Sequence, residues 1–190
     1  MSTGASWREN CWHASVLRAS KLKSVSAALA LAAAVSASPR SARAEGWMVD
    51  GTLALGTGLE GADPGSGDLE WQRARTRIIS GFDLRSDEAE KEALGLRAFA
   101  ELEQRGGVGG EARYSRYLGR WVTGYVHLTG TVAPETLFGG GVGATFALPL
   151  GPRFAFFLEP AFAALPLGSD LPGDSVLMWA TLSLGVRLGL

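Results

Sequence analysis

Apolar and polar residues alternate strictly along Ala180–Leu190, the last eleven residues of the chain. The even positions carry Ala180, Leu182, Leu184, Val186, Leu188 and Leu190, and the odd positions carry Thr181, Ser183, Gly185, Arg187 and Gly189. A period of two puts alternate side chains on opposite faces of a β-strand. The segment therefore predicts a strand with one wholly apolar face, and its length suits a tilted transmembrane strand of about 9–11 residues.

Six other segments show the same alternation. They are residues 47–59, 71–84, 95–103, 121–132, 138–150 and 154–164. An eighth segment, Glu111–Leu118, is ambiguous because Arg113 and Arg116 fall on opposite faces. After residue 44 the chain has no apolar run of the roughly 18 residues that a helical span needs. We therefore predict an all-β fold: a closed, antiparallel, up-and-down transmembrane β-barrel of about eight strands.

The links between these strands fall into two sets. One set is Gly61–Asp68, Gln104–Gly110, Ala133–Thr136 and Pro166–Ser175; the other is Arg85–Leu94, Gly119-Arg120 and Gly151-Pro152-Arg153. Membrane barrels have longer external loops and short periplasmic turns, which assigns the first set to the outside. Arg85–Leu94 is long for a periplasmic turn, and its composition suggests a helical turn at the rim.

The polar face of the alternating segments decides between two kinds of barrel. A soluble, lipocalin-like barrel keeps its apolar face inside, around a small apolar ligand, whereas a membrane barrel reverses the faces. On four strands the polar face is mainly Gly, Thr, Ser and Ala, residues that fit the narrow interior of an eight-stranded barrel. This favours the membrane barrel, and the soluble periplasmic or secreted barrel is the alternative.

The first 44 residues have the pattern of a secretory signal peptide. Three basic residues at positions 18–23 precede Val25–Ala37, an apolar run of 13 residues. Ala42-Arg43-Ala44 then forms an A-x-A cleavage site. The run is shorter than a spanning helix. We predict cleavage after Ala44, which leaves residues 45–190 as one barrel domain.

Cleavage changes the charge of the chain. The whole sequence has a net charge of −1, but residues 45–190 hold 12 basic and 18 acidic residues, a net charge of −6. This argues against binding to nucleic acid, which needs a basic face. The only cysteine, Cys11, leaves with the signal peptide, so no disulfide or thiol chemistry is expected.

Charged residues recur on the predicted inner face. They are Arg73, Arg75, Arg77, Asp83, Arg97, Glu101, Glu103, Glu159 and Arg187. The spacing of two along 73, 75 and 77 predicts that these three arginines point the same way. Buried charges must be paired, so we interpret the set as an interior ion-pair network. The alternative is a small gated pore or a polar binding site.

Four tryptophans lie near predicted strand ends. They are Trp47, Trp71, Trp121 and Trp179. Membrane barrels carry girdles of aromatic residues at both membrane interfaces. We therefore predict an interfacial position for these side chains; the alternative is that Trp is simply common in β-proteins.

The leader, the alternating strands and the final segment together resemble the small bacterial outer-membrane β-barrel superfamily, of the eight-stranded type. The resemblance covers residues 47–190, and Leu190 stands where the family normally ends in an aromatic residue. It implies a monomer in the outer membrane of the Gram-negative envelope. The implied partners are outer-membrane lipid and the barrel-assembly machinery.

Some barrels of this kind modify lipids with a His, a Ser and an acid. Here the only histidine after residue 44 is His127, which has no serine within two strand positions, so a hydrogen-bonded interior histidine is the better interpretation. One histidine and scattered carboxylates make no metal-ligand cluster. We expect a non-enzymatic protein without a cofactor or a metal. Its role would be structural or surface interaction through external loops, with a narrow solute channel as a further alternative.

Overall fold

The computed structural model describes residues 47–63, 70–86, 91–102, 106–169, 171 and 175–190, and at Trp47, Asp63, Arg75 and Ser86 the backbone alone. These residues form eight strands. They are β1 (Trp47–Asp63), β2 (Glu70–Ser86), β3 (Glu92–Glu101), β4 (Val108–Tyr117), β5 (Val122–Ala133), β6 (Leu137–Pro149), β7 (Phe154–Gly168) and β8 (Val176–Gly189). The described residues contain no helix that is long and apolar enough to cross a membrane. The predicted signal peptide and its cleavage site lie outside the described residues.

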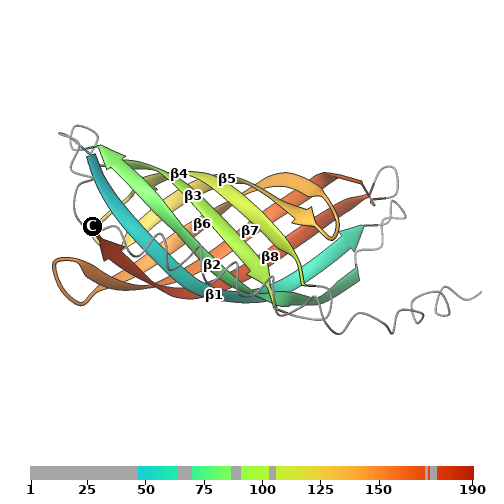
Figure 1. Cartoon of the computed structure of the whole chain (residues 1–190), viewed down its shortest axis with the longest axis horizontal. Coiled ribbons are helices and arrows are strands. Elements are labelled where there is room, and N and C mark those ends of the chain that lie inside the picture. The colour runs from blue at the N-terminus through green and yellow to red at the C-terminus, as the bar shows by residue number, and fades with distance from the viewer. Residues whose placement is uncertain (1–46, 64–69, 87–90, 103–105, 170, 172–174) are drawn as a thin grey trace, which may run out of the picture.

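The strands follow one another around a closed antiparallel barrel (Figure 1). Each pairs with the next along the chain, and β8 closes the ring by pairing with β1, with Leu184 opposite Leu55. The ambiguous segment is a genuine strand, since β4 pairs with both β3 and β5. The predicted all-β, closed, up-and-down barrel of eight strands is confirmed.

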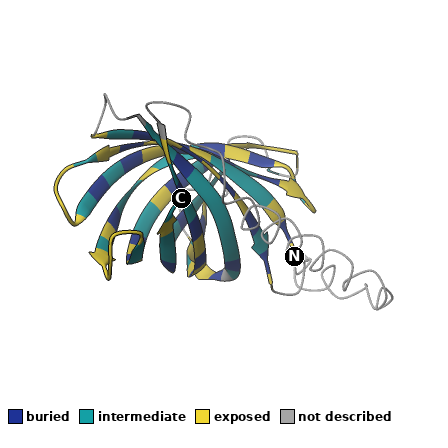
Figure 2. Cartoon of the chain, turned by 60° about the vertical axis from the view of Figure 1, so that its left-hand side comes forward, coloured by how far each residue is buried: buried dark blue, intermediate teal, exposed yellow. Residues whose placement is uncertain are grey.

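The two faces of the barrel differ in polarity. Residues opposite each other in an antiparallel ladder point to the same face. One such row crosses Leu55, Leu184, Leu158, Phe146 and Val122, from β1 through β8, β7 and β6 to β5. Its first four members are exposed, while Ser183, next to Leu184, is buried. Buried and exposed residues alternate in this way along the strands in Figure 2.

The two rims of the barrel are set by the direction of β1. The near rim, where β1 begins and β8 ends, lies at the left of Figure 1, and the far rim lies at the right. At the near rim β2 runs to Ser86 and β3 begins at Glu92, so the strands occupy part of the link for which a helical turn was predicted. Of the remainder, Lys91 is in a turn and 87–90 lie outside the described residues. The near-rim turns 118–121 and 150–153 are short, as predicted.

Candidate functional site

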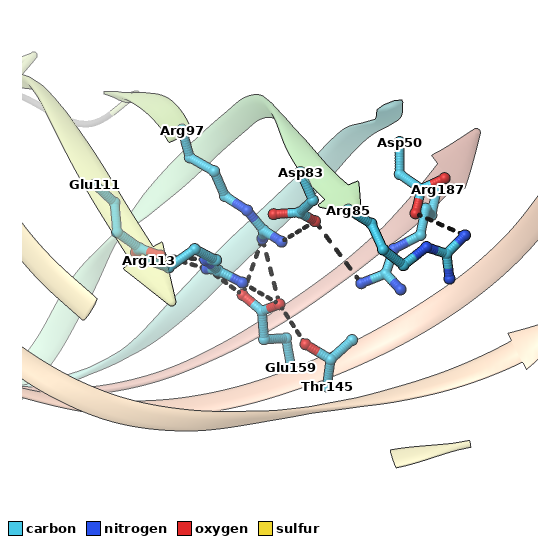
Figure 3. A network of polar contacts seen from close by, with 9 residues as sticks. All are labelled: Asp50, Asp83, Arg85, Arg97, Glu111, Arg113, Thr145, Glu159 and Arg187. Carbon is cyan, nitrogen blue, oxygen red and sulfur yellow. Dashed lines mark hydrogen bonds and ion pairs between the residues drawn. The ribbon is translucent and has the colours of Figure 1, made fainter. Parts of the chain in front are cut away.

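A carboxylate on β7 is the centre of the barrel interior. Glu159 is 3% exposed and accepts hydrogen bonds from three side chains. Arg113 binds it in a bidentate manner at 2.9 and 3.0 Å, Arg97 Nη1 lies 3.1 Å from Oε1, and Thr145 Oγ1 donates to Oε2 at 2.8 Å. A buried carboxylate is tolerated only when paired and hydrogen bonded. Figure 3 shows both guanidinium groups converging on this residue.

Further charged residues extend this centre towards the near rim. Arg97 also lies 3.5 Å from Asp83, which in turn lies 4.0 Å from Arg187. Asp50 and Arg85 are 4.0 Å apart. On β4, Arg113 Nε donates to Glu111 Oε1 at 2.7 Å. We call the whole set in Figure 3 the ionic network: Asp50, Asp83, Arg85, Arg97, Glu111, Arg113, Thr145, Glu159 and Arg187.

The ionic network ties the barrel together. Its members come from every strand except β5. Among them, four carboxylates balance four guanidinium groups, so this set of side chains carries no net formal charge. A glycine makes room for them: a Cβ added to Gly95 would clash with Asp83 Oδ1 and would lie 2.8 Å from Arg113 Cγ. The interior therefore uses small residues beside large charged ones, as a narrow barrel requires.

A second group of side chains fills the interior nearer the far rim. Arg77 pairs with Glu101 at 2.9 Å and lies over two aromatic rings, 3.8 Å from the ring centre of Trp179 and 4.9 Å from that of Phe99. The Trp179 indole donates to Glu60 at 3.1 Å. Buried apolar side chains pack around the two rings. We call the set the far-rim cluster: Arg77, Phe99, Glu101, Leu137, Ala163, Leu165 and Trp179.

The predicted network residues divide between these two groups. Asp83, Arg97, Glu159 and Arg187 lie in the ionic network, and Arg77 and Glu101 lie in the far-rim cluster. The side chain of Arg75 and the whole of Glu103 are outside the described residues.

The prediction that Arg73, Arg75 and Arg77 point the same way is wrong for Arg73. Arg73 is exposed and pairs with exposed Leu59, whereas Arg77 is buried. The register between β1 and β2 shifts between Gly56 and Gly58, so that Thr57 stands opposite two residues of β2. One extra residue reverses the faces beyond it. Arg73 therefore lies on the outer surface, where its guanidinium donates to Thr76 at 3.1 Å.

Four charged members of the ionic network were not among the predicted site residues: Asp50, Arg85, Glu111 and Arg113. Arg113 is the most consequential, because it makes the bidentate contact with Glu159. The same segment carries Arg116, which the structure places on the exposed face, so alternation within the segment does not show which arginine is inside. The neighbouring strand carries the signal that identifies Arg113. His127 is predicted to face inwards and lies opposite Arg113, and opposite residues share a face.

The four tryptophans that were predicted to be interfacial differ in exposure. Trp71 and Trp121 are exposed, at 44% and 46%, and the side chain of Trp47 is outside the described residues. The interfacial prediction for Trp179 is wrong, because this side chain is 3% exposed within the far-rim cluster. Its odd number places it on the same face as Thr181 and Ser183, and that alternation was a better guide than its position near a strand end.

The chemistry available in this interior is ion pairing and hydrogen bonding. His127 is buried and packs beside Tyr125, with ring centres 5.5 Å apart. No group of three metal-binding side chains occurs in the part of the chain that the structure describes. The strongest interactions join strands rather than expose a reactive group.

Comparison with known proteins adds no relative: no protein-family model matches the chain, and no curated protein matches it.

Proposed function

We propose that this chain is a non-enzymatic outer-membrane β-barrel with a structural or surface-interaction role through its far-rim loops. The observation that carries the proposal is the reversed polarity of a closed barrel. Charged side chains such as Arg97 and Glu159 are buried inside, while leucines such as Leu55 and Leu184 are 58% and 62% exposed outside.

The outer surface supports a lipid environment. Exposed leucine, valine and phenylalanine residues occur on seven strands in the described part of the barrel. They include Leu53, Leu55, Leu59, Leu94, Leu96, Val126, Leu128, Val142, Phe146, Leu148, Phe156, Leu158, Phe162, Leu182, Leu184 and Leu188. Soluble monomers rarely expose an apolar patch larger than a few hundred Å². A closed barrel also has no strand edge with unpaired backbone groups, which is the condition for a sheet to lie in hydrocarbon.

The interior supports a structural role over solute passage. Its side chains meet across the barrel, and Glu159 on β7 bonds to Arg97 on β3 and Arg113 on β4. Two cavities among the described residues have volumes of about 30 and 40 Å³. These hold a few water molecules at most. A lipocalin-like role is less favoured, because its ligand needs an apolar interior, whereas charged residues such as Arg97 and Glu159 are buried in this one.

On this proposal, the partners are outer-membrane lipid and the barrel-assembly machinery, and residues 1–44 direct export. Whatever the protein binds at the surface would meet the far rim, where β1 and β2 extend beyond the pairing of β2 with β3. That pairing ends at Arg77 opposite Glu101, seven residues from the start of β2 at Glu70.

Export of the full chain in a Gram-negative host tests the proposal. We expect the protein in the outer-membrane fraction, resistant to alkaline carbonate, and moving differently on a gel before and after boiling. The same chain without residues 1–44 is the control and should stay inside the cell. Recovery of folded full-length protein in the soluble fraction would contradict the proposal. A steady conductance in planar bilayers would favour the channel instead.

A further inference from the structure

A cavity of about 40 Å³ lies inside the barrel, where the ionic network meets the far-rim cluster. Glu111 and Glu159 of the ionic network border it, as do Arg77 and Trp179 of the far-rim cluster. Trp179 also borders the second cavity, of about 30 Å³, which is lined by residues of the far rim such as Glu135. The indole of Trp179 therefore stands between the inner cavity and the far-rim mouth.

His127 supplies an unsatisfied polar atom at the inner cavity. The residue is 6% exposed, and its Nδ1 atom is buried with no hydrogen-bond partner among the described residues. Nδ1 is a donor in one tautomer of a histidine and an acceptor in the other, so it needs a partner in both. Buried polar atoms in folded proteins almost always have a partner, either a protein group or an ordered water.

The size and the charge of the cavity restrict what can fill it. A water molecule needs at least about 10–15 Å³, so the cavity has room for about two. An ion would add charge to surroundings that are already balanced. The charged members of the ionic network are four acids and four bases, and Arg77 pairs with Glu101. The occupant that fits is small, neutral and able to donate and accept hydrogen bonds.

We propose that the inner cavity is a buried hydration site that holds about two water molecules, one of them bonded to Nδ1 of His127. Water in this position completes the hydrogen bonding of His127, which lies opposite Arg113 in the β4–β5 ladder. The hydroxyl-bearing residues Thr129, Thr181 and Ser183 also border the cavity and offer the two to four polar partners that such a water needs. The site concerns the interior alone and does not depend on what surrounds the barrel.

Gly56 keeps part of this site open. A Cβ added there would lie 2.6 Å from Ser183 Oγ and 3.4 Å from Ile79 Cδ1. The variant Gly56→Ala should therefore fill part of the cavity. Gly51, on the same strand, is a matched control, because a Cβ added there would lie 3.9 Å from its nearest neighbours, Leu188 O and Leu190 Cδ1.

High-resolution crystal structures of the folded barrel, with and without xenon pressure, test the proposal. We expect water density within hydrogen-bond distance of His127 Nδ1 in the wild type and in Gly51→Ala, its loss or displacement in Gly56→Ala, and no xenon in the cavity. A wild-type cavity that binds xenon, or that shows no water density, would overturn the proposal, because dry apolar cavities take up xenon. The wild-type measurements decide the question even where Gly56→Ala does not fold.

Discussion

The two halves of the barrel interior hold buried arginine residues in different ways. In the ionic network one carboxylate, Glu159, is shared between Arg97 and Arg113. In the far-rim cluster Arg77 has a carboxylate beside it and lies over two aromatic rings. Loss of the shared carboxylate leaves two cations without their common partner, whereas loss of a ring contact leaves an ion pair intact. The ionic network should therefore be the more sensitive half.

The largest effect is expected for Glu159→Gln. The change keeps the shape of the side chain but removes the charge that faces Arg97 and Arg113. Breaking a buried ion pair costs about 3–5 kcal/mol of the free energy of unfolding. Urea unfolding of the purified, folded barrel measures this loss.

The control for that change is Glu70→Gln, since Glu70 is an exposed carboxylate at the far rim. Its effect should stay within about 0.5 kcal/mol. Equal effects of the two variants would show that the shared carboxylate does not support the barrel.

A smaller effect is expected for Thr145→Val. This change keeps the volume of the side chain and removes only the 2.8 Å hydrogen bond to Glu159. A hydrogen bond to a charged group contributes about 1.5–3 kcal/mol. The same unfolding experiment applies, and combining Thr145→Val with Glu159→Gln should cost less than the sum of the two. Full additivity would contradict the contact.

In the far-rim cluster, Trp179→Phe keeps an aromatic ring near Arg77 and removes the indole N–H that donates to Glu60 at 3.1 Å. The expected loss is about 1.5 kcal/mol, the lower end for a hydrogen bond to a charged group, because Glu60 is only partly buried. The temperature at which the folded gel band disappears should fall only slightly. A fall as large as that for Glu159→Gln would erase the difference between the two halves.

The smallest effect is expected for Arg85→Met at the near-rim end of the ionic network. The Arg85 side chain is 27% exposed and lies 4.0 Å from Asp50. Partly solvated pairs of this kind contribute about 0–1 kcal/mol, and salt weakens them. Unfolding measured at low and high salt should show a small difference that disappears at high salt. A large difference that resists salt would mean that this pair behaves as a buried one.

Much of the fold could be predicted from period two alone. Leu184 and Ser183 fall on opposite faces because successive side chains in a strand must do so, and closure follows from the need to pair every strand. The same rule placed Asp83, Arg97, Glu159 and Arg187 on inner positions. It could not say which carboxylate meets which guanidinium, because that depends on the stagger between strands that are distant in the sequence.

Two residues mark where this reasoning failed. Alternation alone gives the wrong face for Arg73, because a single extra residue in β2 shifts the register beside Thr57. The local pattern of apolar and polar residues does not indicate this extra residue. Trp179 was assigned to an interface because tryptophan is common there, although its neighbours on the same face are Thr181 and Ser183. General preferences for a residue type are weaker evidence than the geometry of the strand that carries it.

The sharing of Glu159 has a consequence for how the chain assembles. Glu159 follows Arg113 by 46 residues and Arg97 by 62, so it lies three strands after the first cation and four strands after the second. Until β7 takes its place, two guanidinium groups on β3 and β4 lack their common anion and remain best solvated by water. A sheet of six strands that closes early would therefore bury these two cations without their common anion, which costs free energy. The full set of eight strands supplies that anion. Glu159 therefore makes closure of the barrel cooperative, because it couples the early strands β3 and β4 to the late strand β7.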